Sequence, residues 1–141
     1  MTLKIKSIVS YGRYYPSSFD ADATYWWFSI SDYKIYATED LITKFHYTTC
    51  LEIEQSGRFI PLFKTDIEEL EEEYLLTLTN KETQEYRMIK EKNKGVEPDT
   101  IFKMFIAFMR LWKNWYAFEY QRLFQDAVKW CKANNISYMQ D

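Results

Sequence analysis

Few residues in this chain have the type and spacing that catalysis needs. His46 is the only histidine, and a general base or a metal ligand there would need a second functional group close by. Its sequence neighbours offer Lys44, Tyr47 and Cys50. A Cys50–His46 nucleophile pair is conceivable at this separation, but no orienting or oxyanion motif accompanies it. We therefore interpret His46 as a surface or hydrogen-bonded side chain and predict no catalytic residue.

The sequence also lacks the motifs that usually bind metals or cofactors. The sequence has no His-x-x-x-His or Cys-x-x-Cys pair and no carboxylate cluster with metal-ligand spacing. Gly12, Gly57 and Gly95 stand alone, so no glycine-rich loop for a phosphate can be written. The two cysteines, Cys50 and Cys131, read as buried apolar residues of a protein in the reducing cytoplasm. We predict no metal and no cofactor.

An acidic run on a predicted helix is the strongest charge signal. Apolar residues recur at helical spacing at positions 67, 70 and 74, so the glutamates between them spread over the remaining surface. A solvated helix face is one interpretation, and a docking face for a basic partner is the other. The run contains Glu71, and its candidate interface residues are Glu68, Glu69, Glu72 and Glu73.

Basic residues gather instead in the second half of the chain. Met1 to Asn80 holds 7 basic and 13 acidic residues, whereas Lys81 to Asp141 holds 11 basic and 8 acidic ones. Lysines that alternate with aromatic rings suit single-stranded nucleic acid, and the candidate contacts are Lys90, Lys92 and Lys94. The rings fall at helical spacing, however, which favours core packing, and the net charge of −3 is unlike that of a dedicated nucleic-acid binder.

Three tyrosines near the start form the other candidate interface. Tyr11, Tyr14 and Tyr15 share a segment with Gly12, Pro16 and two serines, so they follow neither a strand period nor a helix period. Tyrosine gives a large contact area at little cost in conformational entropy, which suits an interface anchor. The alternative is that these rings fold down and cover the edge of a sheet.

The elements that must position these residues change character along the chain. Residues 25–30 and 34–37 predict an aromatic hairpin, and residues 51–53 with 59–62 predict a second one, in which Pro61 indicates an edge strand. Helices are predicted from capping boxes at Thr65 and Thr79, from Pro98, and after Asn114, with Asn135 as a left-handed cap. Of the helical residues, Phe105, Met109, Ala127 and Trp130 are expected in the core.

These elements add up to an α+β fold, with a small N-terminal antiparallel sheet packed against a C-terminal set of about four helices. No linker separates them, so we predict a single domain over residues 1–141. Residues 1–24 are an added strand and loop, residues 25–64 are mostly strands, and residues 65–141 are helical.

The last helix carries a characteristic order of aromatic residues. Trp115-Tyr116-x-Phe118 is followed by Ala127-x-x-Trp130 and then by Asn134-x-Ile136, and Ile60-Pro61 and Lys94-Gly95 precede them. In these features the chain resembles, over roughly Tyr25 to Ile136, the bacterial family numbered 158 among the uncharacterised protein families. The resemblance implies the α+β fold and a bacterial or phage origin, and it implies no activity, cofactor or partner.

The sequence leaves three functional hypotheses. The leading one is a non-catalytic regulatory or protein-interaction module of the bacterial cytoplasm, whose partner is another protein or a second copy of the chain. The second is a nucleic-acid-associated accessory protein that uses the basic C-terminal helices, and the third is a hydrolase with an unrecognised site. No stretch approaches the roughly 20 apolar residues of a membrane helix, and residues 1–10 lack the apolar run of a signal peptide. We therefore expect no membrane partner.

Overall fold

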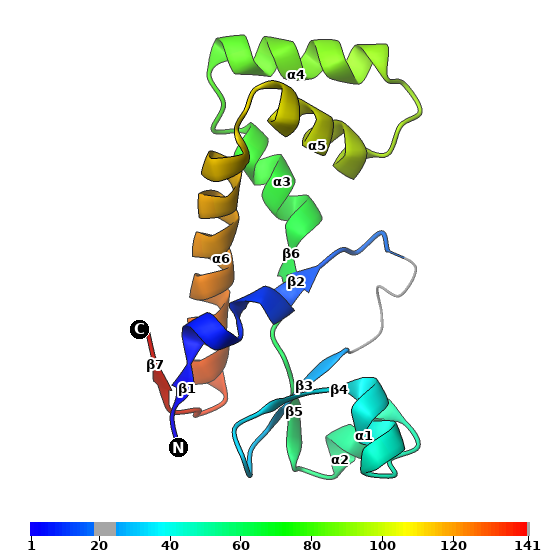
Figure 1. The fold of residues 1–141 in the computed structure, drawn as a ribbon, viewed down its shortest axis with the longest axis vertical. Coiled ribbons are helices and arrows are strands. Elements are labelled where there is room, and N and C mark those ends of the chain that lie inside the picture. Colours follow the sequence, from blue (N-terminus) through cyan, green and yellow to red (C-terminus); the bar gives the residue numbers. More distant parts are fainter. Residues whose placement is uncertain (19–24, 141) are drawn as a thin grey trace. The chain divides into compact units, whose positions relative to one another are not determined.

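The computed structural model describes residues 1–18 and 25–140. It confirms the predicted α+β class, with short strands early in the chain and long helices later (Figure 1). Two short 3-10 helices, η1 (Ile5–Ser7) and η2 (Val9–Gly12), complete its N-terminal segment. The strands are β1 (Leu3–Lys4), β2 (Arg13–Tyr14), β3 (Trp26–Ser29), β4 (Ile35–Ala37), β5 (Phe59–Pro61), β6 (Thr65–Asp66) and β7 (Tyr138–Met139). The α-helices are α1 (Thr38–Lys44), α2 (Cys50–Gln55), α3 (Ile67–Leu75), α4 (Asn80–Lys92), α5 (Pro98–Phe108) and α6 (Trp112–Ala133).

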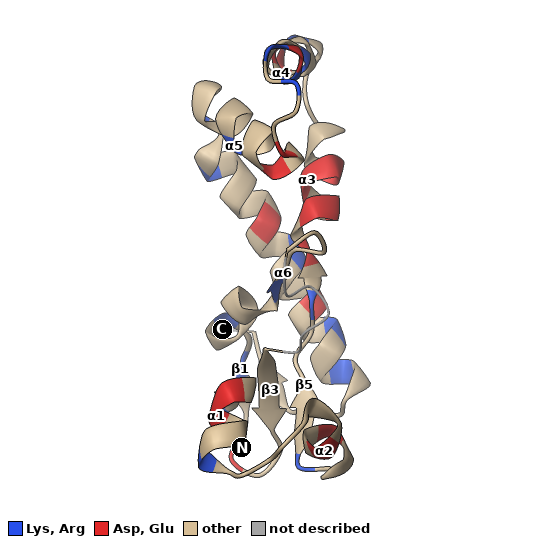
Figure 2. Ribbon diagram, turned by 90° about the vertical axis from the view of Figure 1, so that its right-hand side faces the viewer, with Lys and Arg blue, Asp and Glu red and all other residues tan. Residues whose placement is uncertain are grey.

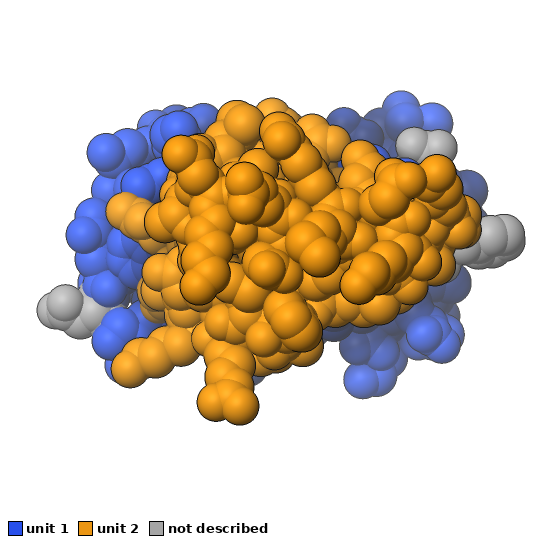
Figure 3. Space-filling view, turned by 90° about the horizontal axis from the view of Figure 1, so that it is seen from above, with its two compact units in different colours: residues 1–65, 123–141 blue, residues 66–122 orange. Residues whose placement is uncertain are grey.

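The chain forms two compact units, which Figure 3 distinguishes by colour. Unit 1 consists of residues 1–65 and 123–141, and unit 2 consists of residues 66–122. Unit 2 is therefore inserted into the sequence of unit 1, and α6 contributes residues to both. The expectation of a single domain stays a prediction.

The main sheet of unit 1 has the order β4-β3-β5, with both pairings antiparallel. The β3–β4 hairpin is the one predicted from the aromatic segment, and Trp27 lies opposite Tyr36 in its register. β5 is an edge strand, as Pro61 indicated, because proline has no backbone N–H to give to a further neighbour. Two further pairings are two-stranded: β2 with β6, and β1 in parallel with β7.

Each face of this sheet has its own apolar cluster. Consecutive residues of a strand point to opposite faces, and Trp27 and Phe28 of β3 accordingly belong to different clusters. Trp27 packs with Leu41 of α1 and Ile53 of α2. Phe28 belongs to the larger cluster. Its other buried members come from the N-terminal segment, from the residues just after β5, from α6 and from the residue after the Asn135 cap: Leu3, Ile5, Ile8, Val9, Leu62, Phe63, Leu123, Ala127, Cys131 and Ile136.

Unit 2 is built from α3, α4, α5 and the first part of α6, around an aromatic centre. Tyr74 of α3 makes edge contacts with Phe102 of α5 and with Trp115 and Phe118 of α6, at ring-centroid distances of 5.2–6.0 Å. The hydroxyl of Tyr74 donates a hydrogen bond to Asn114 Oδ1, which satisfies its polar end. Tyr86 of α4 meets Phe105 of α5 in the same manner.

Several local predictions hold in the structure. Thr79 and Glu82 form the reciprocal capping box at the start of α4, and Pro98 is the first residue of α5. Asn135 has a φ of 57°, and the following Ile136 folds back, its backbone N–H donating to Cys131 O at 2.9 Å. Phe105, Ala127 and Cys131 are buried.

Other predictions are wrong. Residues 51–53 belong to helix α2 and do not form a strand, and Cys50, at its first position, is exposed. The cap of α3 is Asp66 and not Thr65, while α6 begins at Trp112, ahead of Asn114. Met109, expected in the core, is only partly buried, and Trp130 is partly buried too but does pack against the larger cluster.

Candidate functional site

The three candidate tyrosines of the N-terminal segment lie around one pocket of unit 1. Tyr11 belongs to η2, Tyr14 belongs to β2, and Tyr15 follows directly. Together with Tyr25 and Trp26 they line a pocket with a volume of about 140 Å³. The predicted interface residues are therefore brought together by the fold, and Trp26 is a member that the sequence did not single out.

Gly12 lets this segment approach the rest of the unit closely. A Cβ atom on Gly12 would lie 2.1 Å from Cε2 of Phe63, a distance no real contact reaches. The backbone at Gly12 therefore rests against the ring of Phe63, which is itself buried in the larger cluster and lines the pocket. This contact fixes the tyrosines on either side of Gly12 relative to the floor made by Phe63 and Leu62.

Ring contacts orient the walls of the pocket. Tyr11 meets Trp26 edge to face, with ring centroids 4.6 Å apart and an interplanar angle of 65°. Such an arrangement holds two rings at a fixed angle and leaves part of each face open. Trp26 is 36% exposed, in contrast to its neighbour Trp27 at 1%, so β3 turns one indole into the core and the next toward solvent.

Two cations belong to the same pocket. The Nζ atom of Lys64 lies 4.8 Å from the ring centroid of Tyr14, a cation–π contact that keeps the lysine at the pocket. Arg13 is the second basic lining residue, and among the described residues that line the pocket none is acidic. The rings of the pocket can bind an apolar or aromatic group.

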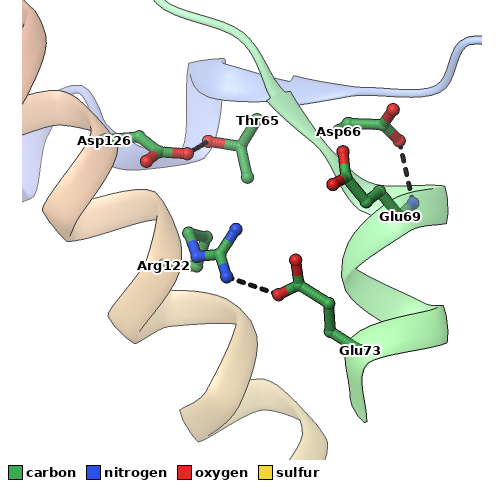
Figure 4. A network of polar contacts seen from close by, with 6 residues as sticks. All are labelled: Thr65, Asp66, Glu69, Glu73, Arg122 and Asp126. Atoms are coloured by element: carbon green, nitrogen blue, oxygen red, sulfur yellow. Dashed lines mark hydrogen bonds and ion pairs between the residues drawn. The ribbon is translucent and has the colours of Figure 1, made fainter. Parts of the chain in front are cut away.

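The acidic run on α3 is not one uniform face. Figure 2 shows the acidic residues of α3 in red along the helix. Glu69 and Glu72 are exposed, whereas Glu73 forms an ion pair with Arg122 of the same unit, whose guanidinium donates a hydrogen bond to it (Figure 4). Glu68 is partly buried, and the backbone N–H of Glu69 donates to the capping carboxylate of Asp66. The acidic docking interpretation loses Glu73 to this ion pair.

Glu71 departs most from its expected place, because only 6% of it is exposed. Position 71 continues the helical spacing of the apolar residues 67, 70 and 74, and this spacing is the sequence signal that indicates its burial. Burial raises the pKa of Glu71 to about 9, and the hydrogen bond and the negative charge of Asp99 act in the same direction. The carboxyl therefore holds its proton at neutral pH.

Asp99 of α5 is the ionised partner of Glu71. Burial alone would raise its pKa, but the hydrogen bond from Glu71 and the ammonium of Lys103 outweigh it, so the pKa is lowered. Lys103 Nζ lies 2.9 Å from Asp99 Oδ2. The buried Asp99 Oδ1 finds no hydrogen-bond donor among the described residues as long as Glu71 is ionised, and a proton on Glu71 supplies the pair with one. The pair shares a single proton and joins α3 to α5.

The remaining candidate residues belong neither to the aromatic pocket nor to the Glu71–Asp99 pair. Lys90 and Lys92 are exposed in the last turn of α4, and Lys94, just beyond it, pairs with Glu91 at 2.8 Å. His46 is exposed with a φ of 63°. Burial raises the pKa of the Cys131 thiol to about 11, which removes its nucleophilic form at neutral pH. Within the described part of the chain, no three side chains of metal-binding type gather.

The described helices include none that is both long enough and apolar enough to span a membrane. No family model, no curated protein sequence and no solved structure matches the chain. The likeness to family 158 thus stays a prediction, and the site has to be judged by its own geometry.

Proposed function

We propose that this chain is a non-catalytic protein-interaction module of the bacterial cytosol, which captures a side chain of its partner in the aromatic pocket of unit 1. The single observation that supports this is the pocket itself, which Tyr11, Tyr14 and Tyr15 line together with Trp26 and Lys64. Tyrosine and tryptophan are the residues that carry much of the binding free energy at protein interfaces. The partner is another protein or a second copy of the chain.

The alternative role of the tyrosines, as cover for the sheet edge, has less support. All three keep solvent-exposed surface: Tyr11 is exposed, and Tyr14 and Tyr15 are partly so. None of them is a buried member of either apolar cluster of unit 1. Residues that only closed the core would lose their surface to it, whereas these surround an open pocket.

Display of a random peptide library tests the proposal. We expect peptides that bind the wild-type chain to lose binding when Tyr11, Tyr14 and Tyr15 are all replaced by Ser, because the replacement removes three walls of the pocket. The matched control is Tyr116→Ser, a single exposed tyrosine of unit 2, which should keep binding. Melting temperatures of all three proteins are measured in parallel, and sedimentation at several concentrations reports self-association.

The proposal is contradicted by either of two results. In the first, the triple variant melts much earlier but still binds the selected peptides, which would make the tyrosines structural. In the second, no selected peptide distinguishes the triple variant from the wild type.

A further inference from the structure

The charged side chains at the aromatic pocket already have partners. Arg13 and Lys64 each interact with another part of the chain, and Lys64 also lies over the ring of Tyr14. A cationic guest would find no counter-charge, because no acidic residue is among the described residues that line the pocket. An anionic guest, in turn, would have to displace the present partners of the two cations. The charges of the pocket therefore favour a neutral guest.

The size and the walls of the pocket suit one small ring. Apolar cavities of roughly 150 Å³ hold a molecule of the size of benzene, and this pocket measures about 140 Å³. Leu62 and Phe63 are its buried lining residues, whereas Tyr11 and Trp26 each keep 36% of their surface exposed. A guest thus packs against aromatic rings at the surface of unit 1 and is not enclosed on all sides.

Trp26 adds a polar group to this wall. An indole N–H donates a hydrogen bond and accepts none. The neighbouring Trp27 donates from Nε1 to Thr38 Oγ1 at 2.7 Å, but the described part of the chain holds no acceptor for Nε1 of Trp26. A guest that covers Trp26 must therefore bring an acceptor, because a buried donor without a partner costs free energy.

A proline-rich peptide meets all three conditions. The proline ring is small and neutral, and proline has no backbone N–H that would need an acceptor in the pocket. Consecutive prolines adopt the polyproline II helix, which has no internal hydrogen bonds and leaves its carbonyls open to a donor. This helix is preformed, so that its binding costs little conformational entropy, and it docks on grooves lined by aromatic rings.

We infer, on the basis of the proposed function, that the pocket recognises a proline-rich segment of the partner in the polyproline II conformation. One proline ring enters between Tyr11, Tyr14 and Trp26, and a backbone carbonyl of the segment accepts a hydrogen bond from Trp26 Nε1. The rings supply the apolar contact, and the hydrogen bond sets the position of the segment along the pocket.

Single-stranded nucleic acid is the competing guest, since its bases also stack on aromatic rings. Proteins that bind such strands combine these rings with a positively charged groove along the backbone. The two cations of this pocket already have partners, and the lysines considered for nucleic acid, Lys90, Lys92 and Lys94, belong to unit 2. The pocket therefore suits a peptide better.

Uncharged synthetic peptides with blocked ends and a fluorescent label test the inference by anisotropy with the full chain. The reference peptide has six consecutive prolines. One comparison peptide carries Ser in place of every Pro, another is this Ser peptide with a single central Phe, and an oligothymidine stands for nucleic acid. Trp26→Phe is the protein variant, because it keeps a ring and loses the N–H. Trp112→Phe, a partly buried tryptophan of unit 2, is its matched control.

We expect the reference peptide to bind more tightly than the Ser peptide by at least about 10-fold, because each ordered proline contributes a factor of roughly 2 to 5. It should also bind more tightly than the Phe peptide. Trp26→Phe should weaken it by about 2- to 10-fold, the range of one neutral hydrogen bond, and Trp112→Phe should not. Circular dichroism verifies that both variants are folded.

Nuclear magnetic resonance of the ¹⁵N-labelled chain locates the contact. The chain has five tryptophans and hence five indole N–H groups, and the Trp26 signal is the one that Trp26→Phe lacks. We expect this signal to move when the reference peptide is added, and the signal that Trp112→Phe lacks to stay in place.

Three results would overturn the inference. They are a reference peptide that does not bind, a Phe peptide that binds at least as tightly, and a Trp26 signal that does not move on binding. In each case the proposed function still stands if other peptides lose their binding when Tyr11, Tyr14 and Tyr15 are replaced. Oligothymidine that displaces the reference peptide would instead assign the site to nucleic acid, and then both the inference and the proposed function fail.

Discussion

Glu71 shows how one residue can alter the pH response of a unit. Its pKa lies at about 9 in the folded chain, against an ordinary value of 4.5. Between these two values the folded state binds a proton that the unfolded state has released, so the free energy of unfolding falls as the pH rises. The stabilisation is complete below about pH 4.5 and is lost as the pH passes through 9. The lowered pKa of Asp99 acts only under more acidic conditions.

Glu71→Gln should remove this dependence, because glutamine still donates a hydrogen bond to Asp99 but has no proton to lose. We expect the wild type to lose up to about 1.4 kcal/mol per pH unit between pH 5 and 9, and the variant to lose much less. Urea unfolding at a series of pH values measures both. Glu69→Gln, an exposed position on the same helix, is the control and should follow the wild type. A Glu71→Gln protein with the wild-type slope would show that the proton is not held there.

Gly12 makes the other residue-scale prediction. Alanine at this position would force the ring of Phe63 to move, because the added Cβ would overlap it. We expect Gly12→Ala to cost about 1–3 kcal/mol of stability, as overpacking does, and to distort the pocket that Phe63 lines. Gly57→Ala is the comparison: it has open space but a φ of +70°, so it should cost roughly 1 kcal/mol and leave peptide binding intact. Thermal melts and peptide anisotropy separate the two effects.

At the scale of elements, signals that span a few residues could be read from the sequence. The Thr79–Glu82 capping box, the β3–β4 hairpin and the Asn135 cap depend on neighbours in the chain, and each is present. Thr65, the expected cap of α3, instead donates to Asp126 Oδ2 at 2.8 Å, and Asp66 caps the helix (Figure 4). Asp126 lies 61 residues further along the chain, so no local sequence pattern could predict this hydrogen bond.

Helix α2 illustrates a competing local signal. Leu51 and Ile53 alternate with polar residues, which is typical of a strand. Thr49 and Glu52 nevertheless stand at helix-capping spacing, and the Thr49 side chain does accept from the backbone N–H of Glu52 at 3.1 Å. Leu51 is 61% exposed and Ile53 is fully buried, so the apparent alternation reflects one buried residue on a short helix.

Trp130 of α6 packs against residues of the sheet of unit 1, and its replacement measures how much this packing stabilises the unit. Its ring meets Phe28 and Phe63, and its Nε1–H donates to Pro61 O at 3.0 Å. Because the side chain is only partly buried, we expect Trp130→Ala to cost about 3 kcal/mol, at the lower end for tryptophan truncation. Trp130→Phe, which keeps an aromatic ring but loses the hydrogen bond, should cost roughly 1 kcal/mol. Chemical denaturation measures both, and equal losses would indicate that the ring contacts contribute nothing.

At the scale of the whole molecule, the sequence predicted the class of fold but not its division. Unit 1 takes residues from both ends of the chain, and nothing in the composition near Thr65 or Leu123 marks a boundary. Helix α6 runs through the second boundary as one continuous helix. Its apolar residues therefore serve two clusters, although in the sequence they resemble a single core-facing stripe. The pocket was beyond prediction for a similar reason, because Trp26 and Lys64 reach the tyrosines only through the fold.

The parallel pairing of β1 with β7 has a consequence for synthesis on the ribosome. Leu3 pairs with Tyr138, and the apolar residues beside β1 share a cluster with Leu123, Ala127 and Ile136. During translation these residues emerge well before residues 123–138, which hold their partners. The inserted residues 66–122 are a contiguous stretch and can begin to fold on the nascent chain, since cooperative units fold as they emerge. By contrast, the apolar side chains of Leu3, Ile5, Ile8 and Val9 stay without these partners until residues 123–138 have left the exit tunnel, and over that interval they are open to a chaperone.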